Sequence, residues 1–163
     1  MKIVSNTGPI IGLAKIGLLF LLNQLASQVI IPPTVRRELL GKIGPETEQI
    51  DRALNEFLKV GDLNPLDPAV EMAVSSLDDG EREVIGLAST MPGDILLLID
   101  DRAGREVAKG LNISVSGVVG ILLLAKEKRM VEKISPLLEE LCDKGYWLSD
   151  EVARVAKRLA GEI

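Results

Sequence analysis

Five side chains with oxygen atoms stand at positions where they could share a metal ion. Asn6 follows the first β-branched run, and Asp100 and Asp101 follow a solid apolar run. Glu38 and Glu81 stand in two segments with helical periodicity. In open parallel sheets, ligands gather at the carboxyl ends of the strands, where such residues can meet. Oxygen ligands suit Mg²⁺ or Mn²⁺, which can generate a hydroxide and stabilise the leaving oxygen in phosphodiester cleavage.

Each of these acids also has a purely structural explanation. Glu38 fits an exposed helix position beside Arg37, and Glu81 fits a first-turn charge favoured by the helix dipole. Asp101 fits the N-cap of a helix that starts at the next residue. Asp100 differs, because a carboxylate at the end of an apolar strand loses hydration unless it binds a cation or accepts hydrogen bonds.

A row of cations follows the acid pair at residues 100 and 101. Arg102, Arg105 and Lys109 fall on one face of an expected helix, where they could steer phosphate groups. The alternative is an ordinary solvated face, with Glu106 interleaved among the cations.

The composition removes several kinds of chemistry. Histidine is absent, which excludes Ser-His-Asp and Cys-His catalysis and His-ligated zinc. The single cysteine, Cys142, has no partner for an internal disulfide, which fits a reducing, cytoplasmic setting. Only four residues are aromatic, so stacking platforms for single strands are nearly absent. A net charge of −5 disfavours non-specific adhesion to nucleic acid, although a locally basic rim stays possible.

Hydrophobic periodicity predicts alternating strands and helices that would position these side chains. Strands are expected at residues 2–6, 28–31, 95–99 and 113–115, with 95–99 as a central parallel strand covered on both faces. Helices are expected at residues 9–26 (interrupted near Gly17), 34–40, 46–58, 69–75, 79–89, 102–110, 118–128, 135–142 and 150–160. The expected N-caps include Asp78 or Asp79, Ser135 and Asp150.

The same pattern predicts the fold class. A chain of 163 residues with 47% hydrophobic content and no evident linker or repeat indicates one domain over residues 1–163. Strands that alternate with helices across short connections predict an α/β protein, a three-layer α/β/α sandwich with a mostly parallel central sheet. No signal peptide is evident, and glycines and polar residues break the aliphatic stretch 10–25, so no membrane span is expected.

Four stretches together resemble the PIN-domain superfamily, in a prokaryotic branch described as predicted nucleic-acid-binding proteins. They are VSNTGPIIGLAKIG at 4–17, VIIPPTVRREL at 29–39, LDDGEREVIGLA at 77–88 and LLLIDDRAGREVAKGLNISVSGVVGILLLAK at 96–126. The resemblance covers nearly the whole chain. It implies a metal-dependent ribonuclease with Mg²⁺ or Mn²⁺ as cofactor, RNA as substrate, and a homodimer. Many PIN domains are toxins of toxin-antitoxin pairs, so an antitoxin protein is a further implied partner.

The resemblance also assigns the site residue by residue. It implies metal ligation by Asn6, Glu38, Glu81 and Asp100, catalysis by Glu38, Glu81, Asp100 and Asp101, and nucleic-acid contacts by Thr7, Arg37, Arg102 and Arg105. Arginines beside the acids could contact RNA or offset the charge of the pocket; these are Arg36, Arg37 and Arg82. The departure from the family pattern is Asn6, which replaces the usual first aspartate and should hold an ion less tightly.

Two other functions stay open at this point. A non-catalytic PIN scaffold that binds RNA or a protein partner would fit the neutral side chain of Asn6. A phosphoacceptor signalling domain would fit the acid pair at residues 100 and 101, but such domains carry the pair after the first strand, which here ends in Ser5-Asn6-Thr7.

Overall fold

The computed structural model describes all residues, 1–163, and contains one five-stranded sheet in which every neighbouring pair is parallel. The strands run in the order β3-β2-β1-β4-β5. Their bounds are β1 (Lys2–Ser5), β2 (Gln28–Ile31), β3 (Leu58–Val60), β4 (Ile95–Leu98) and β5 (Ser114–Ser116). The helices are α1 (Thr7–Lys15), α2 (Leu21–Leu25), α3 (Pro33–Leu40), α4 (Thr47–Glu56), α5 (Pro68–Ala73), α6 (Asp79–Thr90), α7 (Arg102–Gly110), α8 (Val118–Glu127), α9 (Ser135–Asp143) and α10 (Asp150–Leu159).

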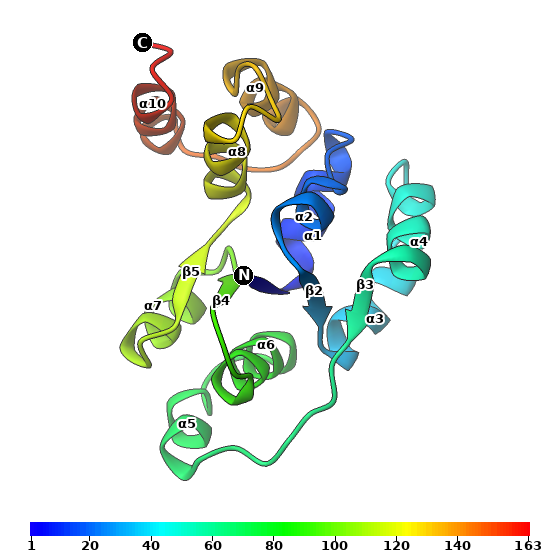
Figure 1. Cartoon of the computed structure of the whole chain (residues 1–163), viewed down its shortest axis with the longest axis vertical. Coiled ribbons are helices and arrows are strands. Elements are labelled where there is room, and N and C mark those ends of the chain that lie inside the picture. Colours follow the sequence, from blue (N-terminus) through cyan, green and yellow to red (C-terminus); the bar gives the residue numbers. More distant parts are fainter.

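Helices cover both faces of the sheet, as Figure 1 shows. On one side α1 packs against α4 and α8, and on the other side α6 packs against α5 and α7. The expected three-layer α/β/α sandwich is therefore confirmed, and the sheet is entirely rather than mostly parallel. No helix is both long enough and apolar enough to cross a bilayer.

The central strands are aliphatic because both of their faces are covered. Ile3 and Val4 of β1 and Leu97 and Leu98 of β4 are fully buried, and Ser5 pairs in register with Leu98. At about 25 cal/mol per Å² of apolar surface, this aliphatic core is the main source of folding free energy. The sheet is therefore a rigid base for the residues that follow its strands.

The side of the sheet on which successive strands are added changes between β1 and β4, although the two strands are parallel. From β1 the chain moves to β2 and then β3 on one side, and it later returns to β4 and β5 on the other side. The carboxyl ends of two neighbouring strands thus separate at a switch point, where α/β sheets bind ligands. Asn6 and Asp100 follow the two strands that flank this point. The backbone N–H of Asn6 donates to the backbone carbonyl of Leu98 at 2.9 Å.

Most predicted elements are confirmed within two residues, but three details were wrong. Leu58 was expected as the last residue of a helix, but it begins strand β3 (58–60), which was not predicted and which forms because these residues pair with β2. The N-cap of α10 is Ser149, whose hydroxyl accepts from the amide of Val152, rather than Asp150. The N-cap of α9 is Ile134, and Ser135 is the first helical residue. The predicted break near Gly17 is confirmed, since its φ of +70° ends α1.

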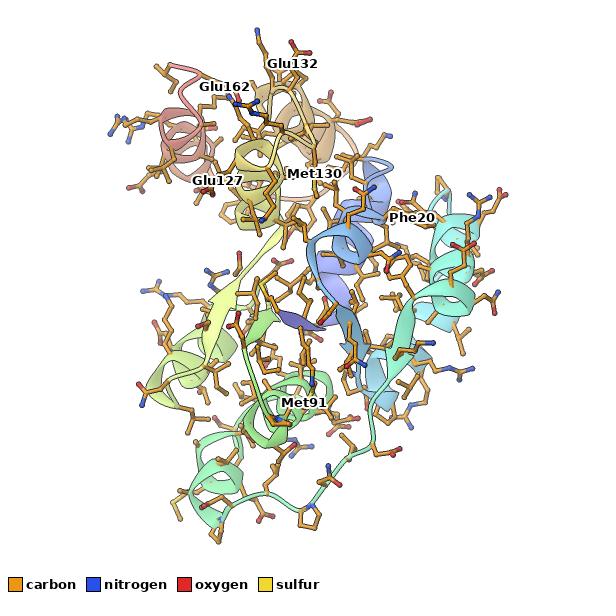
Figure 2. The ribbon with its side chains drawn as sticks, in the orientation of Figure 1. Phe20, Met91, Glu127, Met130, Glu132 and Glu162 are labelled. Carbon is orange, nitrogen blue, oxygen red and sulfur yellow. The ribbon has the colours of Figure 1, made fainter.

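The end of the chain is fastened by the carboxylate of Glu162, which Figure 2 shows between α10 and α9. It accepts hydrogen bonds from Lys126 Nζ at 2.7 Å, from the amide of Ile134 at 2.9 Å, and from the amide and hydroxyl of Ser135 at 2.9 and 2.5 Å. Burial raises the pKa of Glu162, but the bonds from Lys126 and Ser135 outweigh it and hold that pKa well below its ordinary value. One side chain thus joins α8, the start of α9 and the end of the chain.

Close packing of α1 against α8 leads to the first prediction. A Cβ added at Gly12 would lie 2.9 Å from both Tyr146 Cε2 and Val118 Cγ2, whereas nothing lies within 4 Å of one added at Gly110, at the end of α7. We expect Gly12→Ala to lower the free energy of unfolding by about 1–3 kcal/mol, because an overpacked core must shift. Gly110→Ala is the matched control and should be neutral or slightly stabilising, since alanine favours helices. Urea denaturation of both variants checks this, and equal stabilities would contradict it.

Candidate functional site

Oxygen atoms from three separate elements meet around Gly80. A Cβ added at Gly80 would lie 3.1 Å from Glu38 Oε1, 3.3 Å from Asn6 Oδ1 and 3.7 Å from Asp78 Oδ1. Asn6 is the N-cap of α1, but its side chain makes no capping hydrogen bond, so its carbonyl oxygen is free to face this point. The α3–α6 contact is held by Glu83, which accepts from the amide of Thr34 at 3.2 Å and from its hydroxyl. The sheet and this contact therefore set the separation of the three oxygens.

Glu81 lies beside this group in a buried and negative setting. Its exposed fraction is 9%. Burial raises the pKa of Glu81, and the negative charges of Asp78 and Asp101 raise it further. None of the ion pairs in the chain involves Glu81 or Glu38. The cost of this uncompensated charge is what a bound cation would relieve.

Two neighbouring aspartates are partly committed to helix caps. Asp78 Oδ1 accepts from the amide of Glu81 at 2.8 Å at the start of α6. Asp101 Oδ2 accepts from the amide of Gly104 at 2.9 Å at the start of α7. The structural explanation for Asp101 is therefore correct, although its charge still reaches Glu81. Each aspartate keeps its second oxygen for another contact.

Asp100 faces a different set of neighbours from the group around Gly80. Its carboxylate accepts from the hydroxyl of Tyr146, and it lies close to Gly8 and Gly117. Although the residue is exposed, loss of hydration around the carboxylate raises the pKa of Asp100, and Tyr146 and Arg105 only partly offset this. Burial and the charge of Asp100 raise the pKa of Tyr146, so the phenol stays protonated and donates. The expected hydrogen-bond acceptance by a poorly hydrated Asp100 is thus observed.

The basic residues predicted to bind nucleic acid lie in two places. Arg102 and Arg105, together with Lys109, line an open groove of about 770 Å³ that Asp100 also lines. Arg37 is exposed on α3, and its guanidinium donates to the hydroxyl of Thr34 at 2.8 Å. The hydroxyl oxygen of Thr7 is buried at the start of α1 and has no hydrogen-bond partner.

The donor set around Gly80 fits a hard divalent cation. Every donor is an oxygen, and Glu38 and Glu81 have no cationic partner. No three carboxylates are close enough together to hold an ion by themselves. An ion at this point would therefore need further ligands from water or from substrate phosphates, as Mg²⁺ sites usually have.

Sequence reasoning missed two residues of the site. Asp78 was considered only as a helix cap, yet its Oδ1 also lies beside the group around Gly80. Tyr146 was not considered a site residue, and it reaches Asp100 from a segment 46 residues further along the chain. For Asp78 the spacing from Glu81 could have indicated the proximity, whereas no local pattern indicates the contact of Tyr146.

The chain matches a known family over nearly its whole length. A family model described as PIN domain matches residues 2–162. Searches of curated proteins and of solved structures found no significant match. The match extends over nearly the entire chain, including all five strands and every residue of the candidate site. This protein therefore belongs to the PIN-domain family, which has a nuclease-type fold.

Proposed function

We propose that this protein is a Mg²⁺- or Mn²⁺-dependent endoribonuclease of the PIN type, with a metal site weakened by Asn6. The observation that carries the proposal is the meeting of Asn6 Oδ1 and Glu38 Oε1 around Gly80, at the switch point of the sheet and beside the unpaired, buried Glu81. PIN domains generally use divalent metal ions, which agrees with this all-oxygen donor set.

In this proposal the site residues have distinct tasks. Around Gly80, Asn6, Glu38 and Glu81 would hold the metal ion, and Asp101 would assist by its charge next to Glu81. Asp100, whose carboxylate faces Tyr146, would supply the remaining ligand from the end of the neighbouring strand β4. A bound ion supplies Lewis acidity for the phosphate and activates water, which is the nucleophile in place of a protein side chain. Asp100 is oriented by the hydroxyl of Tyr146, and Arg105 is oriented by a hydrogen bond to the carbonyl of Ile99 at 3.1 Å.

Contacts with RNA are assigned to cations at the rim and to the buried hydroxyl of Thr7. Arg102 and Arg105 attract phosphate groups into the groove that Asp100 also lines, and Arg37 does so from α3. Thr7 stands at the N-terminus of α1, where its unpartnered hydroxyl and the helix dipole favour an anion. A protein antitoxin and a homodimer are further proposals that rest on the family membership. A cytoplasmic location is also proposed, and it rests on the single free thiol of Cys142.

A non-catalytic PIN scaffold that binds RNA or a protein partner is the second candidate. Two observations favour it: the side chain of Asn6 is neutral, and no three carboxylates converge closely enough to hold an ion alone. The two candidates differ in whether the wild-type site binds a metal ion.

Calorimetric titration with Mn²⁺, combined with a cleavage assay on varied RNA substrates, separates the candidates. We expect wild type to bind Mn²⁺ and cut RNA, Asn6→Asp to bind about tenfold more tightly because it adds a charged ligand, and Asp100→Asn to lose binding and cleavage. Binding by Asn6→Asp alone, with no cleavage by wild type, would replace the nuclease with the scaffold. Cleavage by Asp100→Asn at the wild-type rate would reject the assignment of Asp100.

A further inference from the structure

The only tryptophan of the chain is exposed next to the candidate site. Trp147 lies in the segment between α9 and α10, and 82% of its surface is accessible. The preceding residue, Tyr146, is anchored by its hydrogen bond to Asp100 and by its contact with α1 at Gly12. Gly145 has a φ of +90°, which turns the chain into this segment. A large apolar ring is thus held in solvent by a neighbour that is fixed to the site.

Trp147 lines the same groove as the cations of α7. Arg102, Arg105 and Lys109 form one part of the lining, and the segment from Tyr146 to Ser149 forms another. Gly117 and Val118, at the start of α8, lie between them in the chain and also line the groove. Asp100 belongs to this lining as well, so the groove reaches one of the candidate catalytic groups.

Three cations (Arg102, Arg105 and Lys109) and two carboxylates (Asp100 and Glu106) line the groove, and this excess of positive charge favours a phosphate-bearing ligand. Arg105 is fixed by its bond to the carbonyl of Ile99, and Arg102 contacts Glu106 only at 3.4 Å, with 93% of its side chain exposed. Lys109 takes part in none of the ion pairs of the chain. Cations that track a backbone and an exposed aromatic ring that stacks a base are the two parts of a single-strand binding surface.

We infer that Trp147 stacks an unpaired base of the nucleic-acid substrate, while Arg102 and Lys109 contact its phosphates along the groove that Asp100 also lines. The inference rests on the proposed function for the identity of the substrate, and it adds the groove that the strand occupies and a residue that selects for unpaired nucleotides. A base within a duplex cannot present its face to the indole ring, so paired RNA is a poorer ligand for this groove.

The single tryptophan makes the inference directly measurable. In EDTA, where no metal-dependent cleavage occurs, we titrate the protein with an unstructured RNA of about 10 nucleotides and with the corresponding duplex. We expect the single strand to quench the fluorescence of Trp147 and the duplex to quench it several-fold more weakly. With end-labelled RNA, Trp147→Ala should weaken binding about tenfold, and Trp147→Phe should restore most of the affinity.

The cations are tested by salt dependence. Lys109→Gln should reduce the slope of log affinity against log salt by about 0.7, the value for one phosphate contact on a single strand. Arg52→Gln, on α4 and outside the groove, is the matched control and should leave the slope unchanged. An unchanged slope in Lys109→Gln would overturn the phosphate contact assigned to that residue.

The outcomes separate this inference from the proposed function. RNA that binds without quenching, with Trp147→Ala equal to wild type, overturns the stacking assignment even if Mn²⁺-dependent cleavage is present. If RNA quenches the fluorescence and Trp147→Ala binds RNA more weakly, but no RNA is cut in Mn²⁺, the stacking inference is supported and the proposed nuclease activity is rejected. If no RNA binds at all, the inference fails, and a protein partner replaces RNA as the ligand to be tested at the exposed ring of Trp147.

Discussion

Glu81→Gln is expected to reduce metal-dependent RNA cleavage by about 100-fold or more and, at the same time, to stabilise the metal-free protein. The loss follows if Glu81 is a metal ligand, as proposed above, because the substitution removes its charge next to the group around Gly80. The gain in stability follows because the carboxylate is buried next to Asp78 and Asp101, and its pKa is raised by that burial and those charges. Glutamine keeps the shape of the side chain and removes the repulsion.

The pH dependence of this effect has a defined sign. A raised pKa in the folded state means that the folded protein holds the proton of Glu81 more tightly than the unfolded chain does. The free energy of unfolding therefore decreases as the pH rises through the raised pKa and Glu81 becomes charged. The advantage of Glu81→Gln over wild type in EDTA should therefore be largest at neutral pH. It should shrink as the pH falls toward about 4.3, the ordinary pKa of glutamate.

Thermal unfolding in EDTA and initial cleavage rates in Mn²⁺ measure the two effects separately. Glu56→Gln is the matched control, because Glu56 is exposed on α4 and has no ion pair. It should change neither quantity. Cleavage by Glu81→Gln at the wild-type rate would exclude Glu81 as a ligand, and a lower unfolding temperature would show that its carboxylate stabilises the fold.

Glu162→Gln is expected to lower the free energy of unfolding by about 2–3 kcal/mol at neutral pH. The substitution weakens the bonds to Ser135 and leaves Lys126 Nζ without its carboxylate partner. We take the lower end of the range for a broken ion pair because the side chain of Lys126 is 26% exposed and is partly screened by water. The effect should appear in stability and not in Mn²⁺ affinity, since Glu162 lies outside the site.

The pKa of Glu162 is depressed, so the sign of its pH dependence is the opposite of that for Glu81. Its contribution is fully present above the ordinary glutamate pKa of about 4.3 and is lost as the pH falls below it. Wild type and Glu162→Gln should therefore approach each other in acid. Glu132→Gln, an exposed acid labelled in Figure 2, is the control and should match wild type at every pH. Equal denaturation midpoints for Glu162→Gln and Glu132→Gln would contradict this prediction.

Local sequence patterns were enough to predict nearly all of the helices and strands and the edge of the sheet at which the candidate site lies. Apolar runs such as 95–98 form buried strands, and Asp78 and Asp101 cap the helices that follow them, because these choices depend on residues a few positions apart. The exception is β3. Leu58 continues the apolar spacing of the preceding helix, so only pairing with β2 shows that residues 58–60 are extended.

Which of the predicted acids lie together could be learned only from the folded chain. It places Asn6, Glu38 and Asp78 around Gly80, and it turns Asp100 toward Tyr146 and the cationic groove. It also brings Trp147 into that groove, although the small number of aromatic residues in the sequence argued against stacking. The physical reason is the same in each case: these contacts join segments far apart in the chain, and their geometry depends on how whole helices pack on the sheet.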